Sequence, residues 1–365
     1  MLLSTLRTPA ILIDRARAIR NLDRMQAEAS ANGIRLRPHA KTHKSPLIAK
    51  WQLDRGAIGI CCAKLGEAEV FADHGVQDIR LPYPLSPANA DRVVALSNRT
   101  RLSFIVDHPT VAQQWSDALV RRARQIDVLV KVDVGFHRCG IDPGGNPIDM
   151  IRMVSTLPGL RLKGLLSHAG HAYHAHSEDE LKTMAEDEAR VMRDLADRCR
   201  NAGVTIDEIS AGATPPARFS IKQKGFTEYR PGNYVYFDRT QVALGAATME
   251  DCALTVLATV VSKPAADRII FDSGSKTLTN DGARGFTPAP GHGVVIDHPD
   301  LLIERLSEEH ATVKATNGST RLEPGDRVRI IPNHSCVVSN LVDQVWLMDG
   351  ENVEALPIAA RGKIT

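Results

Sequence analysis

The sequence predicts an α/β protein with a (β/α)8 barrel of the TIM type followed by a C-terminal all-β domain. From about residue 34 to 230, short β-rich runs alternate with stretches of helical spacing, which is typical of a parallel sheet. Eight such units within about 200 residues favour a closed barrel over an open doubly wound sheet. After Thr240 the β-rich runs follow one another without helices, which indicates an all-β unit.

The expected barrel strands are short apolar runs that end in polar residues. They cover residues 34–39, 57–62, 78–83, 102–107, 126–133, 160–167, 204–210 and 226–230. Helical spacing between them is clearest at 87–96, 110–122 and 178–202. We expect the barrel to span residues 15–240 and to carry its chemistry at the C-terminal ends of the strands.

The C-terminal part has the pattern of an antiparallel β unit. Its expected strands cover residues 253–262, 268–272, 310–315, 326–331 and 344–348. Gly and Pro cluster at 282–293 and 324–325, where they predict turns. One more strand is expected at 8–14, before the first helix. The sequence therefore predicts a β domain over residues 241–365 that the strand 8–14 joins.

The composition is that of an ordinary globular protein with a sizeable core. Of 365 residues, 43% are hydrophobic and 24% are charged, and 45 basic against 43 acidic residues leave a formal net charge of +2. This balance indicates neither a nucleic-acid-binding nor a membrane-binding surface. Six cysteines lie scattered without a CxxC pair, and the N-terminus has no long apolar stretch. We therefore expect a cytoplasmic enzyme.

The first barrel strand ends in a basic string that contains Lys41. Because side chains alternate along a strand, Arg37, His39, Lys41 and His43 are expected to share one face. A lysine in a barrel mouth beside imidazoles and a guanidinium has a lowered pKa and becomes a nucleophile toward an aldehyde. The alternative is a basic surface loop.

The string from Arg37 to Lys44, RPHAKTHK, resembles the lysine motif of the D-threonine aldolase/D-serine dehydratase family. Further similar stretches lie at residues 8–10, 132–140, 230–234, 306–310 and 332–336. These are fold-type III enzymes with an alanine-racemase-like barrel and a β domain. The resemblance implies that Lys41 holds pyridoxal 5′-phosphate.

Two glycine-containing turns are candidates for the phosphate of that cofactor. A dianion needs backbone N–H groups that no side chain crowds, typically at a turn before a helix. The turns lie at 210–214 and 232–234, and both match phosphate-binding positions of the family. We expect contacts from Gly212, Thr214, Gly232, Asn233 and Tyr234, although each turn alone is also typical of a plain βα connection. Relatives often carry a second hydroxyl residue where this chain has 215–217, Pro-Pro-Ala.

Arg138 and His39 are the predicted cationic and imidazole contacts of the cofactor. Arg138 follows the fifth strand, where a guanidinium can orient the oxygen on the cofactor ring or the lysine. An ion pair with Asp133 is the alternative. His39 is expected on the same face as Lys41.

The stretch after the sixth strand, SHAGHAYH from Ser167, is rich in imidazole groups. The resemblance favours Tyr173 as a cofactor contact and His168 as the base that acts on the substrate hydroxyl. His171 and His174 are equally well explained as solvent-exposed loop residues.

His334 and Cys336 are, after the Lys41 string, the second strong indication of a functional site. Two ligands at i and i+2 of a strand project to one side and can hold a metal with open positions left. A buried histidine beside an inert cysteine is the alternative. In the family the matching pair binds a divalent cation. Some members have Asp in place of Cys, which suits Mn²⁺ or Mg²⁺, whereas a thiolate favours Zn²⁺.

Together these residues and the resemblance predict a lyase that acts on small D-amino acids with a 3-hydroxyl group. The resemblance also implies a homodimer. Retro-aldol cleavage to glycine and an aldehyde, the D-threonine aldolase reaction, is the first interpretation. D-serine or D-3-hydroxyaspartate dehydration to a keto acid and ammonia is the alternative, which Cys336 favours. A racemase is less consistent, because no tyrosine follows Tyr236 to serve as a second base. A carrier protein would leave the β domain and its metal pair unexplained.

Overall fold

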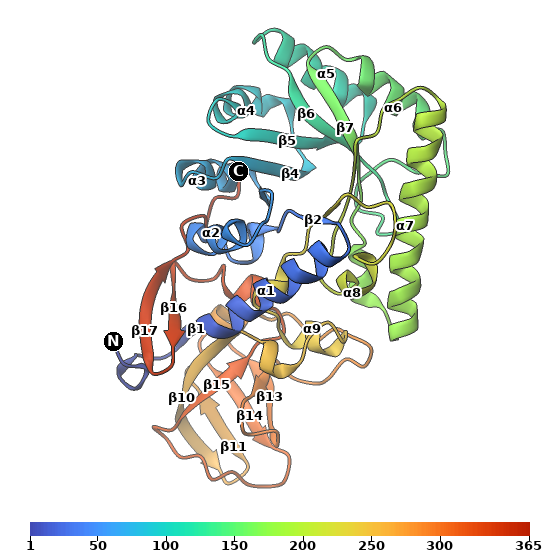
Figure 1. Cartoon of the computed structure of the whole chain (residues 1–365). Coiled ribbons are helices and arrows are strands. Elements are labelled where there is room, and N and C mark those ends of the chain that lie inside the picture. Colours follow the sequence, from blue (N-terminus) through green and yellow to red (C-terminus); the bar gives the residue numbers. More distant parts are fainter.

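The computed structural model describes residues 1–365 and contains two sheets (Figure 1). The first sheet has eight strands that pair in parallel in the order β2-β9-β8-β7-β6-β5-β4-β3. Its strands are β2 (Arg35–Leu36), β3 (Ile60–Cys61), β4 (Asp78–Pro84), β5 (Arg101–Val106), β6 (Ile126–Lys131), β7 (Leu160–Leu166), β8 (Glu208–Ala211) and β9 (Glu228–Tyr229). A parallel bridge between His39 and Cys61 joins the two ends of this order and closes the barrel. The predicted fold class is confirmed.

Helices cover the outside of the barrel. They are α1 (Arg15–Ala31), α2 (Pro46–Asp54), α3 (Leu65–Asp73), α4 (Ala90–Ser97), α5 (Pro109–Val120), α6 (Pro147–Thr156), α7 (Glu178–Asn201) and the short α8 (Ala217–Ser220). Their starts follow local chemistry: Asp14 and Ser177 cap α1 and α7 by accepting from backbone N–H groups, and α2, α5 and α6 begin with proline.

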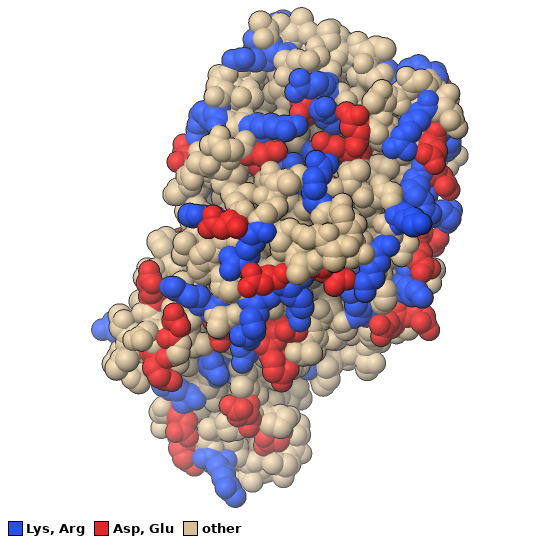
Figure 2. Space-filling model, in the orientation of Figure 1, with Lys and Arg blue, Asp and Glu red and all other residues tan.

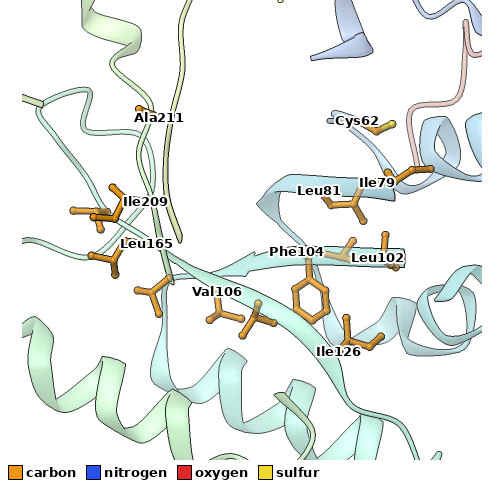
Figure 3. Close-up of a cluster of buried hydrophobic side chains, with 14 of the residues drawn as sticks. Cys62, Ile79, Leu81, Leu102, Phe104, Val106, Ile126, Leu165, Ile209 and Ala211 are labelled. Carbon is orange, nitrogen blue, oxygen red and sulfur yellow. The ribbon is translucent and has the colours of Figure 1, made fainter. Parts of the chain in front are cut away.

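The main apolar core lies between the barrel strands and these helices. Figure 3 shows part of it, with Phe104 and Val106 of β5, Ile126 of β6 and Leu165 of β7 in one cluster of buried side chains. Inside the barrel, by contrast, lies a buried ion network. Glu228 accepts from Arg37 Nε at 2.7 Å and from Arg80 Nη1 at 2.6 Å. Burial alone would raise the pKa of the Glu228 carboxyl, but the charges of Arg80 and Arg37 lower it to about 2.

The second sheet has nine strands, mostly antiparallel. They are β1 (Ala10–Asp14), β10 (Leu254–Ala265), β11 (Arg268–Phe271), β12 (Val294–Val295), β13 (Leu301–Leu306), β14 (Ala311–Ala315), β15 (Arg327–Ile331), β16 (Gln344–Asp349) and β17 (Asn352–Pro357). Seven of them run in the order β13-β14-β11-β10-β1-β16-β17, with β15 pairing β10 and β12. β1 pairs antiparallel with β10 and parallel with β16, so this N-terminal strand lies in the middle of the sheet. The sequence analysis missed β12, β13 and β17.

Short helices complete the structure. They are α9 (Arg239–Ala243), α10 (Ser275–Leu278), α11 (Ser335–Val338) and the 3₁₀ turns η1 (Leu3–Thr5), η2 (Ala40–Thr42), η3 (Pro87–Asn89), η4 (Gly170–His174), η5 (Asn233–Val235) and η6 (Met249–Asp251). None of the helices combines the length and the apolar character that a membrane span requires. Figure 2 shows basic and acidic side chains intermingled over one face of the molecule.

Candidate active site

One cavity of about 780 Å³ lies at the C-terminal ends of the barrel strands, where the second sheet adjoins the barrel. Its wall contains ten of the twelve residues that the sequence analysis selected. These are His39, Lys41, His168, Tyr173, Gly212, Thr214, Gly232, Asn233, His334 and Cys336. The structure thus brings together residues that are up to 297 positions apart in the sequence, counted from His39 to Cys336.

Lys41 is exposed in this cavity, but it is not on a strand. β2 ends at Leu36, and the chain turns after Pro38 into η2, in which the Lys41 backbone N–H donates to His39 Nδ1 at 3.3 Å. Burial, followed by the charge of Lys41 and of Arg230, lowers the pKa of His39 well below its usual value. His39 is therefore a neutral imidazole beside the lysine.

The expectation that four alternating residues share one face is wrong for Arg37 and His43. Neither of them lines the cavity. Arg37 lies in the barrel interior, in the ion network with Glu228, and His43 is fully buried with its Nδ1 accepting from Ser45 N at 3.1 Å. For His43 the physical reason is the 3₁₀ turn, which replaces the two-residue period of a strand by a three-residue period. Arg37 precedes this turn and is held in the barrel interior by its ion pairs with Glu228 and Asp78.

The two glycine-containing turns are in contact with each other. Thr214 Oγ1 accepts from the backbone N–H of Gly232 at 3.3 Å and of Asn233 at 3.0 Å. Gly212 has to be glycine, because a Cβ there would lie 2.7 Å from the Arg230 carbonyl oxygen. At Gly232 a Cβ would lie 3.1 Å from Thr42 Oγ1. The turns therefore form one edge of the cavity with backbone and hydroxyl groups and little side-chain bulk.

Two predicted cofactor contacts, Arg138 and Tyr234, lie outside the cavity wall. Arg138 is exposed, and its guanidinium lies 5.0 Å from the centre of the Phe136 ring. The alternative ion pair with Asp133 is not formed either, because Asp133 accepts from Gly135 and His137. Tyr234 is buried in the core of the second sheet, where its hydroxyl accepts from Gln52 Nε2 at 3.1 Å.

His168 lies beside the Gly212 turn with a defined tautomer. A carbonyl oxygen can only accept, so the 2.6 Å contact of His168 Nδ1 with Gly212 O places the hydrogen on Nδ1. Burial, and then the charge of Lys131, lower the pKa of His168 well below its usual value. The ring is therefore neutral, with Nε2 able to accept a proton.

Arg230 and Gln241 line the same cavity, and the sequence analysis did not select them. Arg230 is buried and donates to Ser210 Oγ at 2.7 Å and to the Ser167 carbonyl. Gln241 is fully buried, and neither polar atom of its side-chain amide makes a hydrogen bond within the chain. A buried amide in a cavity wall needs a hydrogen-bonding partner, which a polar ligand or a water molecule can supply.

The predicted metal pair comes from a loop and a helix rather than from a strand. β15 ends at Ile331, His334 precedes α11, and Cys336 is its second residue. Cys336 Sγ lies 3.2 Å from Thr42 Oγ1 and 3.4 Å from Asn233 Nδ2, so it sits next to the η2 turn. His334 lines the same cavity wall as Cys336.

Two carboxylates flank this pair. Asp238 is fully buried and accepts from Asn233 Nδ2 at 2.6 Å and from Ser335 N at 2.9 Å. Asp281 Oδ2 lies 2.5 Å from His334 Nδ1. Burial opposes the charged form of His334, but Cys336, Asp238 and Asp281 raise its pKa to about 10. No group of three or more His, Cys, Asp or Glu side chains surrounds a common point, so the pair leaves further coordination positions open.

Comparisons with known proteins agree with this architecture. Residues 13–240 match the family model "Alanine racemase, N-terminal domain", and residues 253–348 match "Putative serine dehydratase domain". The D-threonine aldolase of an Arthrobacter species is 35% identical over 360 residues, which cover 97% of this chain and 93% of the relative. The D-threo-3-hydroxyaspartate dehydratase of Delftia sp. strain HT23 is 35% identical over 351 residues and 92% of each chain.

The solved structure of that Delftia dehydratase superposes with a TM-score of 0.92 at 31% identity and covers 98% of each chain. Barrel, second sheet and cavity together define an alanine-racemase-like protein of fold type III. Within this class, the chain belongs to the D-threonine aldolase/D-serine dehydratase family.

Proposed function

We propose that the protein is a lyase that uses pyridoxal 5′-phosphate and a divalent cation to act on D-3-hydroxy amino acids, with retro-aldol cleavage as its reaction. One observation carries the proposal: Lys41 and the His334/Cys336 pair come from opposite ends of the chain and open into one cavity. Relatives that are 35% identical are a D-threonine aldolase and a D-threo-3-hydroxyaspartate dehydratase, which supports the substrate class.

The cavity fits pyridoxal phosphate. Lys41 would hold the aldehyde carbon. The phosphate would lie against the turns with Thr214, Gly232 and Asn233, where it would take the place of Thr214 Oγ1 as acceptor for the backbone N–H groups of Gly232 and Asn233. When bound, the cofactor supplies an electron sink for negative charge at the substrate Cα. Arg138 and Tyr234 have no part in this proposal, because neither lines the cavity.

The His334/Cys336 pair fits a divalent cation. An imidazole and a thiol that meet at one wall, with open positions beside them, favour Zn²⁺ over Mn²⁺ or Mg²⁺. When bound, the cation supplies a Lewis acid for the substrate hydroxyl. One solved structure of the Delftia dehydratase is of a mutant in the metal-free form.

The chain's own groups then direct the proton transfers. His168, neutral and with Nε2 free, accepts the proton of the β-hydroxyl as the Cα–Cβ bond breaks and the aldehyde leaves. Return of one proton to Cα then completes glycine. In the alternative, Lys41 accepts the Cα proton, the hydroxyl leaves, and hydrolysis yields a keto acid and ammonia. The thiol of Cys336 favours this dehydratase reaction, since a His/Cys metal pair resembles that of the D-serine dehydratases, whereas some aldolases of the family have Asp at the second position.

One assay separates the two reactions. Protein loaded with pyridoxal phosphate and Zn²⁺ or Mn²⁺ is incubated with D-threonine, D-serine or D-threo-3-hydroxyaspartate, and the products are analysed. Glycine with the matching aldehyde supports the aldolase proposal, whereas keto acid with ammonia supports the dehydratase alternative. Racemised substrate without either product set would refute the lyase proposal, as would wild-type protein that binds no pyridoxal phosphate.

We also propose that the functional unit is a homodimer, with residues 15–240 as the cofactor-binding barrel and 241–365 plus 8–14 as the β domain. Light scattering coupled to gel filtration tests the dimer directly. A monomer that is fully active would refute it.

A further inference from the structure

A hydrogen bond between Asp281 and His334 has no role in the proposal above. Asp281 Oδ2 lies 2.5 Å from His334 Nδ1, and both side chains are about one third exposed, at 37% and 36%. A carboxylate accepts hydrogen bonds when ionised, so the hydrogen of this contact belongs to Nδ1. An imidazole has to be neutral to bind a cation, and with the hydrogen on Nδ1 the lone pair that binds it is the one on Nε2.

The backbone of Asp281 is fastened to the residue that precedes His334. Asn333 is buried, and its Nδ2 donates to the Asp281 carbonyl at 3.0 Å and to the Gly291 carbonyl at 3.0 Å. On the other side, the Asp281 N–H donates to Thr279 Oγ1 at 3.2 Å. Asn333 lies in the connection between β15 and α11 and holds the loop that carries Asp281. The position of the Asp281 carboxylate relative to the His334 imidazole is therefore fixed.

From this geometry we infer that Asp281 is a positioning residue, which sets the tautomer and ring orientation of His334 so that Nε2 is presented to the cation. This inference rests on the cation site of the proposed function. Carboxylates in this position also increase the basicity of a ligating imidazole, and their loss typically lowers metal affinity by about 10–100-fold. Asp281 contacts the His334 ring at Nδ1, and no group of three or more potential ligands surrounds a common point, so we assign it a supporting role and not that of a ligand.

The experiment compares cation affinity in Asp281→Ala, Asp281→Asn and wild type, each saturated with pyridoxal phosphate and freed of metal by a chelator. Zn²⁺ is titrated against a chromophoric competitor. We expect Asp281→Ala to bind Zn²⁺ about 10–100-fold more weakly. Asp281→Asn should retain most of the affinity, because its amide oxygen still accepts the Nδ1 hydrogen. Asp349→Ala is the matched control, since this exposed carboxylate of the second sheet only pairs with Arg15 at 3.9 Å.

A second measurement separates positioning from ligation. With saturating Co²⁺, the visible bands of Asp281→Ala should keep the intensity and thiolate charge transfer of the wild type, because the set of ligands is unchanged. If the Co²⁺ bands of Asp281→Ala differ from those of the wild type, and Asp281→Asn binds Zn²⁺ as weakly as Asp281→Ala, Asp281 is itself a ligand. This result would overturn the inference. Loss of folded protein or of pyridoxal phosphate in Asp281→Ala would overturn it too, by showing a structural role.

Failure of the inference and failure of the proposed function have different signatures. Equal Zn²⁺ affinity in wild type and Asp281→Ala would refute the positioning role alone. Wild-type protein that takes up neither Zn²⁺ nor Co²⁺ would refute the cation site of the proposed function, and the positioning role with it.

Discussion

His43 shows how burial alone can set the protonation of a side chain that the sequence places next to the reactive lysine. It is fully buried, packs edge-on against Phe71 and accepts from the Ser45 backbone through Nδ1. Burial lowers the pKa of His43 to about 4. The ring is therefore neutral in the folded protein over a pH range in which an exposed histidine is charged.

This difference predicts a loss of stability in weak acid. Between pH about 6.5 and about 4 the unfolded chain binds a proton at position 43 that the folded protein does not, so stability falls as the pH falls through this window. The contribution of this one residue is about 3 kcal/mol. Urea unfolding at several pH values should show a shallower pH dependence for His43→Asn, which keeps an acceptor for Ser45 N. Parallel curves for the two proteins would contradict the prediction.

His168 allows a second prediction at the level of a single residue. If its Nε2 accepts the hydroxyl proton, His168→Asn should lower kcat for retro-aldol cleavage by ~10²–10⁴-fold. Binding of Zn²⁺ should be unchanged, because α11 is not altered. Binding of pyridoxal phosphate should be retained, because the amide N–H of asparagine can still donate to Gly212 O. His176→Asn is a suitable control, since this exposed imidazole lies beyond the cavity wall. Undiminished cleavage by His168→Asn would assign the base to another group.

The candidate site was predictable from the sequence where its chemistry is concentrated in short strings. Lys41 and the His334/Cys336 pair stand in such strings, and both line the cavity. Gln241 and Asp281 could not be found this way. Gln241 was selected because its buried amide has no hydrogen bond, and Asp281 because it contacts His334, which is 53 positions away in the sequence. Neither feature produces a recognisable pattern in the neighbouring sequence. Tyr234, in contrast, was predicted to contact the cofactor because it lies in a motif of the family, but its side chain is buried in the core of the second sheet.

At the level of elements, Gly164 determines how β7 approaches β8. Lys163 is an extra residue opposite β6, since Val128 pairs with Leu162 and Leu129 with Gly164. Gly164 then lies opposite Glu208, and a Cβ at Gly164 would come within 1.8 Å of the Glu208 carbonyl oxygen. No relaxation of a side chain can remove a clash with backbone. The two strands can pair here only because this residue of the bulge is glycine.

We therefore predict that Gly164→Ala separates β7 from β8 and destabilises the protein by more than ~2 kcal/mol. Because His168 follows β7 and Gly212 follows β8, the variant should also bind pyridoxal phosphate more weakly. Thermal unfolding and a cofactor titration measure the two effects. Gly145→Ala is the control, as its Cβ would meet only Asp142 at ordinary contact distances of 3.6 Å and more. Equal melting temperatures for both variants would contradict the argument.

The strands that the sequence analysis missed illustrate what local patterns leave out. β13 and β17 are the two ends of the seven-strand path in the second sheet, and each pairs with one neighbour only. An edge strand faces solvent on one side, and both strands carry exposed charges, Glu304 in β13 and Glu354 in β17, that interrupt an apolar run. In the barrel, β2 and β9 have only two residues each with regular strand pairing. The strands predicted there, residues 34–39 and 226–230, are therefore longer than those in the structure.

At the scale of the whole molecule, the apolar core of the second sheet also includes residues of two barrel helices, α1 and α2. Leu22 of α1 and Ile48 of α2 pack in the same buried cluster as Ile13 of β1 and Leu254 of β10. α1 lies between the two sheets in Figure 1. Because β1 pairs with β10 and β16 and leads directly into α1, the sheet that carries His334 and the barrel that carries Lys41 are joined by both backbone and packing. The separation between these two groups is therefore fixed.

This coupling predicts that damage in the second sheet also destabilises the barrel. In a Trp346→Phe background, the remaining tryptophans, Trp51 and Trp115, both lie on helices of the barrel and report on its unfolding. Adding Ile13→Ala removes buried methyl groups from the shared core and should cost about 2–5 kcal/mol. If the two parts unfold together, the urea midpoints measured by tryptophan fluorescence and by far-ultraviolet circular dichroism will shift by the same amount. Both are measured at one fixed protein concentration. A barrel fluorescence transition that stays in place while the circular dichroism transition moves or splits would show that the two sheets unfold independently.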